Sequence, residues 1–429
     1  MLDKFNQTIF YFFLFFLPWQ TILILRELTI ANEKFQYGTI GIYFFEIILF
    51  IWILLNLSIL KSCHNKKILY SVLVFIIYIL LSIFWSPDKL ISLYFLIPLL
   101  LGGLSFLILQ KKMLSFKKFT FVFVFSIFLQ GILGVYQFLN QIIYSNKWLG
   151  ISEHLAWQGG SSVIETSAGR FLRAYGGMPH PNILGGFLAI AILLGVGAYL
   201  KATEKEKYWK YFLLICIVLN FFSLLVTFSR SALFSLFLGL FLFLVYYLYN
   251  KRLHLIKNLL FIISIFFLIS ALFFSLFSEL LINRLDVTSR LEKKSINERL
   301  LFIKEAQEII TQKPILGTGV GNYTPFLLKN NHTPKEVWQF QPVHNIYLLI
   351  FAELGIIGFS LFLFIIIFII CDFLESFTKE NTNRVIFSIV TISLLFLSLF
   401  DHWLWTTHSG VIAFWLILSF SREKYINPT

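Results

Sequence analysis

Twelve long apolar segments constrain the fold of this chain more than any other feature. An α-helix needs about 20 consecutive apolar residues to cross the hydrocarbon core of a bilayer. Hydrophobic residues make up 58% of the 429 positions and charged residues only 13%, a balance too apolar for a soluble domain. We therefore expect an all-α polytopic membrane protein, one integral domain over 1–429, with transmembrane helices at 8–25, 39–60, 68–86, 90–109, 119–143, 182–200, 210–227, 231–249, 256–277, 344–371, 384–402 and 405–420.

The first segment follows a short polar start and precedes no small-residue cleavage site, so we interpret it as a retained span and not a signal peptide.

Cationic loops stay on the cytoplasmic side of a membrane. Alternate loops carry the cations Lys61, Lys66 and Lys67; Lys111, Lys112, Lys117 and Lys118; Lys201, Lys205, Lys207 and Lys210; Lys251, Arg252 and Lys257. Both termini are then cytoplasmic, and the two long loops, 144–181 and 278–343, lie outside.

The formal net charge of +13 is largely this topology signal, so it does not point to nucleic-acid binding. The cysteines fit the same topology: Cys63 falls in a cytoplasmic loop, while Cys216 and Cys371 fall within or at the end of spans. Because none lies in an outside loop, we expect no structural disulfide. The sequence shows no soluble domain, low-complexity linker or alignable repeat.

The outside loop 144–181 contains Arg170 and Arg173 and then a run dense in glycine and proline that ends at His180-Pro181-Asn182. Arginines at the outer edge of a span often extend to phospholipid headgroups, which is our interpretation of Arg170. Arg173 lies beside the constrained run and is a candidate for function. Asp88, in the turn after the third span, is expected to cap a helix end, and the alternative is that it orients a basic partner.

Arg230 lies where two apolar runs meet with almost no loop between them. An ionised group this close to the hydrocarbon is costly, so by default it marks a functional site. The alternative is a topological anchor in a tight hairpin. We favour function because the other outside turns are poor in cations.

In the outside loop 278–343, Ser295 and Glu298 form a capping-box pattern that predicts a helix start, and Pro314 ends the helix. Arg299 lies in its first turn, where backbone N–H groups favour an anion. The helix should lie along the membrane surface, because one side is charged and the other carries the apolar stripe Leu301, Phe302, Ala306, Ile309 and Ile310. The loop's other cations are expected to form a solvated face: Arg284, Arg290, Lys293 and Lys294.

The glycine-rich run Gly317–Gly321 lacks the Lys-Ser/Thr of a nucleotide-binding P-loop, so we expect a flexible turn.

His344 then opens the tenth span, where a helix N-terminus helps to keep a neutral base available near pH 7. Asn345 could hold the imidazole or a sugar hydroxyl. Gly355 and Gly358 are expected to permit close helix packing.

Asp401, His402 and His408 cluster at the last outside turn. A metal site there is conceivable, but the cluster has no cysteine and no second carboxylate, so we expect none. Nor does the chain contain an Asp-x-Asp motif.

Several of these elements come in a characteristic order. They are the arginine-containing loop with His180-Pro181-Asn182, Ser229-Arg230 at a tight outside turn, Arg299 followed by Pro314-Ile315-Leu316-Gly317-Thr318-Gly319, and His344-Asn345 with Glu353-Leu354-Gly355-Ile356-Ile357-Gly358. In this order and spacing the chain resembles the O-antigen ligase and polymerase superfamily of bacterial envelope enzymes. The resemblance covers the whole topology and is sharpest over 299–358.

The resemblance implies a membrane glycosyltransferase of the C-type architecture with one large periplasmic loop, in the bacterial inner membrane. Such an enzyme moves a glycan from undecaprenyl diphosphate to an acceptor without a metal, nucleotide sugar or other cofactor. Arg230 and Arg299 match the family's catalytic arginines, and His344 matches its histidine, a general base or acceptor-orienting group. Arg173, His180 and Asn345 are the expected substrate-binding residues.

The acceptor remains open at this stage. Our first interpretation is a ligase that joins a polysaccharide to lipid A-core or a similar surface anchor. The alternatives are an O-antigen or exopolysaccharide polymerase, a protein O-oligosaccharyltransferase and, from another class, a lipid or glycan transporter.

Overall fold

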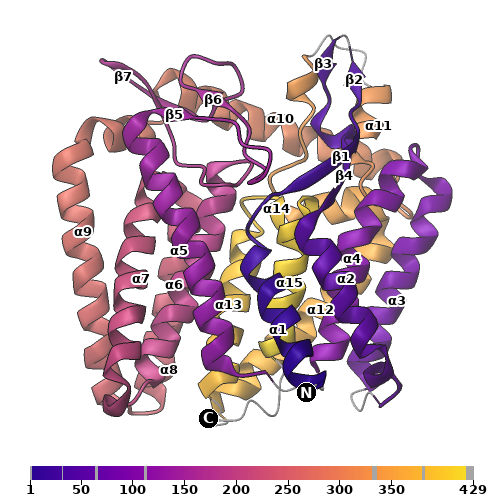
Figure 1. Ribbon diagram of the computed structural model, residues 1–429. Coiled ribbons are helices and arrows are strands. Elements are labelled where there is room, and N and C mark those ends of the chain that lie inside the picture. The colour runs from indigo at the N-terminus through magenta and orange to yellow at the C-terminus, as the bar shows by residue number, and fades with distance from the viewer. Residues whose placement is uncertain are drawn as a thin grey trace.

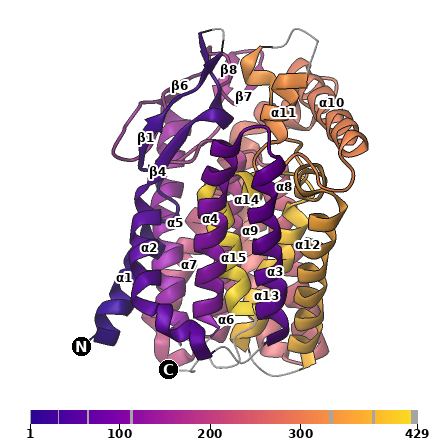
Figure 2. The same ribbon diagram turned by 90° about the vertical axis from the view of Figure 1, so that its right-hand side faces the viewer.

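The computed structural model describes residues 2–30, 32–62, 66–110, 114–330, 336–378 and 382–421. It confirms the all-α class: 74% of the described residues are helical, and the strands among them are few and short. Long helices stand side by side in one bundle (Figure 1 and Figure 2). The helices of the bundle are α1 (Leu2–Phe16), α2 (Phe44–Asn56), α3 (Lys66–Ser82), α4 (Lys89–Leu109), α5 (Phe116–Asn140), α6 (Pro181–Lys201), α7 (Lys207–Val226), α8 (Arg230–Tyr249), α9 (Leu253–Leu285), α12 (Ile346–Thr378), α13 (Thr382–Leu397), α14 (Trp403–Thr406) and α15 (His408–Ser421).

The chain is an integral membrane protein. Among the described residues, seven helices are long and apolar enough to cross a bilayer, namely α4, α5, α6, α7, α8, α9 and α12. Four more are apolar but shorter: α2, α3, α13 and α15. Each of the twelve expected segments contains a helix, so their positions agree, while the number of actual crossings stays a prediction.

The first expected span is wrong in its extent. Helix α1 ends at Phe16, and Pro18 follows, which cannot donate a helical hydrogen bond. The chain then forms strand β1 (Ile22–Arg26), which pairs antiparallel with β4 (Ile40–Tyr43) at the start of the second expected span. Between them β2 (Thr29–Ile30) and β3 (Glu33–Lys34) complete an N-terminal ribbon that the sequence did not predict.

The two ends of the bundle differ. Helix α1 begins and α15 ends at one end, and the ribbon, α10 (Arg290–Gln312) and α11 (Tyr323–Asn330) lie at the other (Figure 1). Loop 144–181 lies at this second end as well and forms two small antiparallel pairs, β5 (Ile142–Ile143) with β6 (His154–Leu155) and β7 (Val163–Thr166) with β8 (Gly169–Leu172). This arrangement agrees with the expected topology, but the side of the membrane that each end faces stays a prediction. Cys63, Lys111 and Lys112 lie outside the described residues.

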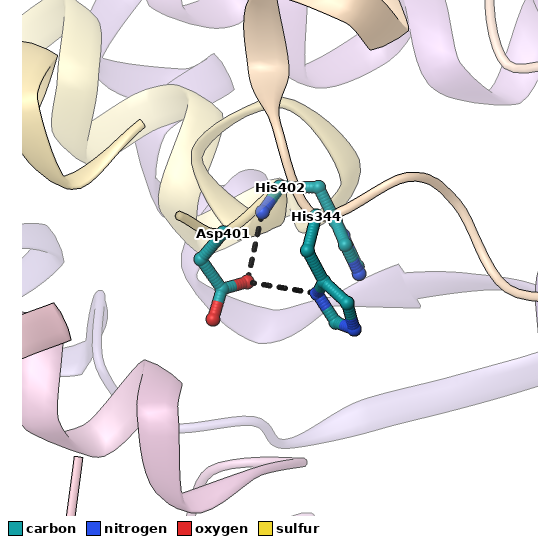
Figure 3. A group of neighbouring side chains, drawn as sticks. All are labelled: His344, Asp401 and His402. Atoms are coloured by element: carbon teal, nitrogen blue, oxygen red, sulfur yellow. Dashed lines mark hydrogen bonds and ion pairs between the residues drawn. The ribbon is translucent and has the colours of Figure 1, made fainter. Parts of the chain in front are cut away.

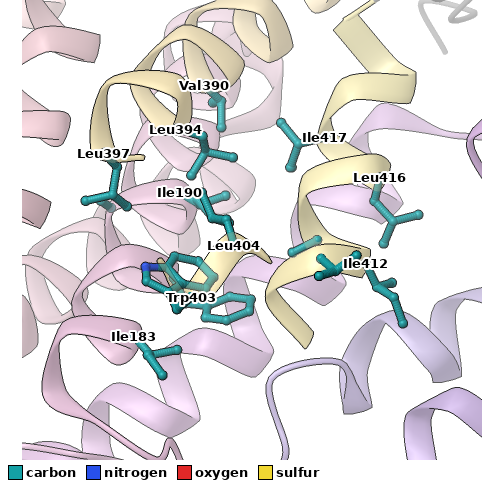
Figure 4. Close-up of a cluster of buried hydrophobic side chains, with 14 of the residues drawn as sticks. Ile183, Ile190, Val390, Leu394, Leu397, Trp403, Leu404, Ile412, Leu416 and Ile417 are labelled. Carbon is teal, nitrogen blue, oxygen red and sulfur yellow. The ribbon is translucent and has the colours of Figure 1, made fainter. Parts of the chain in front are cut away.

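The core lies along α6, which is almost wholly buried, whereas most of α9 is exposed on the outside of the bundle. Gly186 of α6 leaves room for Trp403, because a Cβ there would lie 2.4 Å from its Cζ2 atom. This packing fixes the turn that precedes α14. Side chains from α6, α13, α14 and α15 fill the core (Figure 4), including Ile183, Ile190, Val390, Leu394, Leu397, Trp403, Leu404, Ile412, Leu416 and Ile417.

Helix α10 differs from its prediction at the start. It begins at Arg290 after Ser289 and not at the capping-box pattern, because Glu292 already bonds to two arginines and fixes an earlier turn. The expected apolar stripe is largely confirmed: Phe302 and Ile309 are buried, although Leu301 is exposed.

Gly355 and the run Gly317–Gly321 also depart from expectation. Gly355 interrupts α12 with a φ of 63°, and a Cβ there would lie 2.2 Å from the carbonyl oxygen of Ile315. The glycine run is therefore no flexible turn, since it packs on this interruption, where Gly319 N–H donates to the carbonyl of Glu353 (2.7 Å). Gly358 does permit close packing, against the ring of Tyr78.

Candidate functional site

His344 lies just before α12, at the end of the bundle where the long loops gather. Asn345 caps this helix: its Oδ1 accepts from Leu348 N–H (3.0 Å), and its Nδ2 donates to the carbonyl of Leu399 (3.2 Å). Ile346 N–H donates to the carbonyl of Ser398 (2.9 Å). Asn345 thus ties the start of α12 to the 398–402 turn, and these contacts use both ends of the amide that we expected to bind substrate.

The imidazole of His344 lies against that turn (Figure 3). Its Nδ1 is 3.9 Å from Oδ1 of Asp401, and its ring stacks on that of His402 at 4.9 Å between centroids. The ring of Phe302 in α10 is 6.0 Å away on another side. The side chain is 28% exposed, so it is held in place yet open to a ligand.

Asp401 is a buried carboxylate with several donors. Its Oδ1 accepts from His402 N–H (2.8 Å) and its Oδ2 from Asn182 Nδ2 (3.0 Å). Burial alone would raise the pKa of Asp401, but the neighbouring His344 outweighs burial and holds this pKa well below its usual range. Asp401 is therefore ionised at physiological pH.

His402 and His180 flank this carboxylate as neutral imidazoles. Burial, reinforced by the charge of His344, lowers the pKa of His402 to about 3. Burial, reinforced by the charge of Arg173, lowers the pKa of His180 to about 3. Nδ1 of His180 accepts from Asn182 N–H (3.1 Å) at the start of α6, so His180 orients Asn182, which in turn bonds to the carboxylate.

Arg173 is buried and joins the same network from the loop before α6. Its Nη2 donates to Oδ1 of Asn182 (2.7 Å), its Nε to the carbonyl of Thr227 (2.7 Å) and its Nη1 to Oγ of Ser162 (2.8 Å). Hydrogen bonds thus connect Arg173 through Asn182 to Asp401, whose Oδ1 lies 3.9 Å from Nδ1 of His344.

Arg230 stands at the start of α8, beside a second arginine that the sequence had suggested was solvated. Phe228, with a φ of 49°, turns the chain between α7 and α8, and its carbonyl accepts from Nε of Arg284 (3.3 Å). Nη2 of Arg230 donates to Glu292 (2.8 Å), and Arg284 bonds to the other oxygen of the same carboxylate. The expectation for Arg284 is therefore wrong: its side chain is only 13% exposed.

Arg173 lies close enough to Arg230, Arg284 and Glu292 to interact with them electrostatically. Burial, and next the charge of Arg284, lowers the pKa of Arg173, and Arg230 adds to the effect. Arg299, two helical turns after Glu292, belongs to the same electrostatic group, because its charge also acts on Arg284. In the part of the chain that the structure describes, its guanidinium makes no hydrogen bond or ion pair. The cluster thus holds more positive than negative charge, which favours binding of an anion.

The other predicted residues are placed as follows. Asp88 caps α4, accepting from Leu90 and Ile91 N–H (3.0 and 3.1 Å). Arg170 contacts its own loop, since its Nη1 donates to the carbonyl of Trp157 (3.2 Å) and its Nε lies 3.8 Å from Oε1 of Glu165. His408 is not part of the site, because it pairs with Glu46 of α2 at 2.5 Å.

A metal could find three donors here, since one ligand atom each from His344, Asp401 and His402 lies within 4.8 Å of the others. However, the two rings are nearly parallel, at 26°. Because the lone pair of a ring nitrogen lies in the ring plane, stacked rings do not direct both lone pairs at one ion. The arrangement fits a histidine–carboxylate pair better.

Sequence reasoning missed Arg284, Glu292 and Asn182, and it treated Asp401 only as a metal ligand. Asn182 carried a signal, since it ends the His-Pro-Asn motif that precedes α6. For Arg284 and Glu292 there was none, because both stand in a mixed-charge stretch.

One protein-family model matches part of the chain. Residues 213–363 match the family model described as O-Antigen ligase. This stretch runs from α7 into α12 and contains Arg230, Arg299 and His344, whereas Arg173 and Asp401 lie outside it. None of the curated proteins compared with the chain matches it.

Proposed function

We propose that this membrane protein is a glycosyltransferase of the ligase type, because residues 213–363 match the family model described as O-Antigen ligase. It moves a polysaccharide from undecaprenyl diphosphate to lipid A-core or a similar surface acceptor, with inversion at the anomeric carbon and without a metal. The observation that supports this most is the pairing of a half-open imidazole with a buried carboxylate, His344 with Asp401, next to a cluster of arginines.

In the proposed reaction an acceptor hydroxyl attacks the anomeric carbon of the donor. The new glycosidic C–O bond forms as the bond between that carbon and the diphosphate oxygen breaks, and the electron pair leaves with the diphosphate. Nε2 of His344 takes the hydroxyl proton as general base. Asp401, which stays ionised, then stabilises the imidazolium and orients the ring. Arg173, His180 and Asn345 act as positioning residues in this proposal, since each bonds to a group that holds Asp401 or the turn around it.

The arginines serve the leaving group. Negative charge grows on the diphosphate as the sugar departs, and a guanidinium offers fixed charge with paired N–H donors that match phosphate oxygens. Arg230 and Arg299 are the groups proposed to contact it, because Arg230 is partly exposed and Arg299 has no hydrogen-bond partner among the described residues. In a site of low dielectric constant, such contacts between guanidinium and phosphate are stronger than they are in water.

A transfer assay tests the proposal. The purified protein is given a labelled glycan on undecaprenyl diphosphate together with lipid A-core, and the product is separated by chromatography. Label on the lipid A-core supports the ligase. Longer glycan that stays on undecaprenyl diphosphate would make the protein a polymerase, and label that merely crosses the membrane of a vesicle unchanged would make it a transporter.

A further inference from the structure

Glu292 places one carboxylate between two arginines. Its Oε2 accepts from Arg230 at the start of α8 (2.8 Å), and its Oε1 accepts from Arg284 near the end of α9. The Glu292 side chain is 5% exposed, so this carboxylate is nearly removed from water. The ends of three consecutive helices, α8, α9 and α10, therefore meet at this one group.

A carboxylate and a phosphate group present oxygens to a guanidinium in the same way. Glu292 therefore occupies N–H donors of the cluster that an anion arriving at Arg230 would use. It is also the acidic residue in the first turn of α10, where the helix dipole favours negative charge. The protein thus supplies its own anion to the arginines when no other is bound.

Helix α10 connects this contact to the imidazole. Arg299 follows Glu292 by seven residues, or about two helical turns, and therefore lies on the same face. Phe302, on the next turn, lies against the ring of His344. A change in the partner of Glu292 is consequently transmitted along a helix that carries a second arginine and touches the proposed base.

The charge of the diphosphate explains why such a competitor is useful. This step rests on the proposed function. When the sugar leaves, the diphosphate gains a terminal ionisable oxygen, so the product carries more negative charge than the donor. The arginines bind the product more tightly than the donor, and that would slow its release.

We propose that Glu292 is an internal competitor of the diphosphate: it holds Arg230 and Arg284 in the empty site, yields them to the donor, and lowers the affinity of the two arginines for the product, so that the product leaves faster. It acts as a specificity-determining residue, because an anion must carry enough charge to exchange with it. A doubly charged diphosphate can do so, whereas a singly charged anion exchanges poorly.

The test measures binding of inorganic pyrophosphate to the full-length protein in detergent by titration calorimetry. Glu292→Gln should bind it about tenfold more tightly than the unaltered protein, the gain expected if the carboxylate leaves the arginines free in about one molecule in ten. Glu165→Gln is the matched control. Glu165 pairs with Arg290, which is 72% exposed and lies two residues before Glu292. The affinity of Glu165→Gln for pyrophosphate should equal that of the unaltered protein. Equal or weaker binding by Glu292→Gln would overturn the proposal.

Removing the charge of Glu292 leaves two arginines without their carboxylate, which can prevent folding. Glu292→Asp covers that case, since it keeps the charge but shortens the reach. Glu292→Asp should bind pyrophosphate several-fold more tightly than the unaltered protein. An unchanged affinity would overturn the proposal, just as it would for Glu292→Gln. Inorganic phosphate carries less charge and exchanges poorly with the carboxylate, so in Glu292→Gln its affinity should gain at least as much as that of pyrophosphate.

Glycan transfer gives a separate readout. Pyrophosphate should inhibit transfer at about tenfold lower concentration in Glu292→Gln than in the unaltered protein. If pyrophosphate affinities follow the prediction while no acceptor receives glycan, the proposed function fails and the competitor stands. If transfer proceeds and the affinities of Glu292→Gln and the unaltered protein are equal, the competitor fails and the function stands.

Discussion

Arg173 and Arg230 lie at the same end of the bundle but are held in different ways. Arg173 is buried and donates to three neutral acceptors of the protein, the Thr227 carbonyl, Ser162 and Asn182. Arg230 is 31% exposed and has a carboxylate, Glu292, as its main partner. Neutral partners packed around a buried guanidinium fix it in place, whereas a charged partner can be exchanged for another anion. In the proposed function, one arginine thus supports the imidazole and the other binds the ligand.

The largest expected effect concerns His344, the imidazole to which Arg173 is linked. His344→Ala should lower kcat for glycan transfer by about 10²- to 10⁴-fold, because the general base is lost. The variant should still insert into the membrane and bind pyrophosphate as before. If His344→Ala kept half of the activity, His344 would not be the general base. If the variant still moved unmodified glycan across a membrane, the protein would be a transporter.

Arg173→Lys should come next, with kcat reduced by about 10²-fold. A lysine cannot hold Asn182, Ser162 and the Thr227 carbonyl together, so Asp401 and the imidazole move, and small misplacements are costly. Because Arg173 acts through other groups in this account, the KM for donor should change little. A large rise in KM with constant kcat would instead make Arg173 a direct ligand of the diphosphate.

Arg230→Lys and Arg299→Lys should change binding as well as turnover. Each keeps the charge but loses the paired donors, so kcat should fall, and the KM for the donor and the dissociation constant for pyrophosphate should rise about tenfold, equivalent to roughly 1.4 kcal/mol. Measuring kcat and KM for these variants beside Arg173→Lys sets the two kinds of arginine against each other. Identical profiles would abolish the distinction.

Stability should depend on pH through the neutral imidazoles near Asp401. The pKa of His402 is lowered to about 3 in the folded protein, against about 6.5 in an unfolded chain. The unfolded state therefore takes up a proton below pH 6.5 that the folded state excludes, and stability falls by about 1.4 kcal/mol per pH unit between about pH 6 and 3. The thermal midpoint of His402→Gln in detergent should decline less steeply with acidification. An identical decline in both proteins would show that this ring is already charged.

A chelator should produce the smallest effect, none on the rate of transfer. The arginines, and no divalent ion, stabilise the diphosphate in this account. Loss of activity with chelator that zinc, magnesium or manganese restored would transfer that role to a metal at His344, Asp401 and His402.

Much of the bundle could be predicted from the sequence, because long apolar runs leave a chain few alternatives in a bilayer. The N-terminal ribbon could not, since its strands are short and the apolar residues around Pro18 look like the end of a span. Helix α10 starts earlier than its capping-box pattern because the contacts of Glu292 with Arg284 and with Arg230, which is distant in sequence, outweigh that local signal.

For the candidate site, the order of motifs suggested His344, Arg230, Arg299 and Arg173, and their roles stay predictions. Their partners were not predictable, because Asn182, Asp401 and Glu292 come from three segments whose meeting depends on how the helices pack. Gly355 shows the same limit: a small residue in an apolar run suggests close packing, and only the fold reveals that it interrupts the helix.

The most direct test of the central claim is a cryo-electron microscopy map of the protein with a diphosphate-linked glycan donor bound to the His344→Ala variant. The account predicts diphosphate density between Arg230 and Arg299, with Glu292 displaced from Arg230 and the anomeric carbon facing position 344. Density for the diphosphate anywhere else, with Glu292 still bound to both arginines, would contradict it.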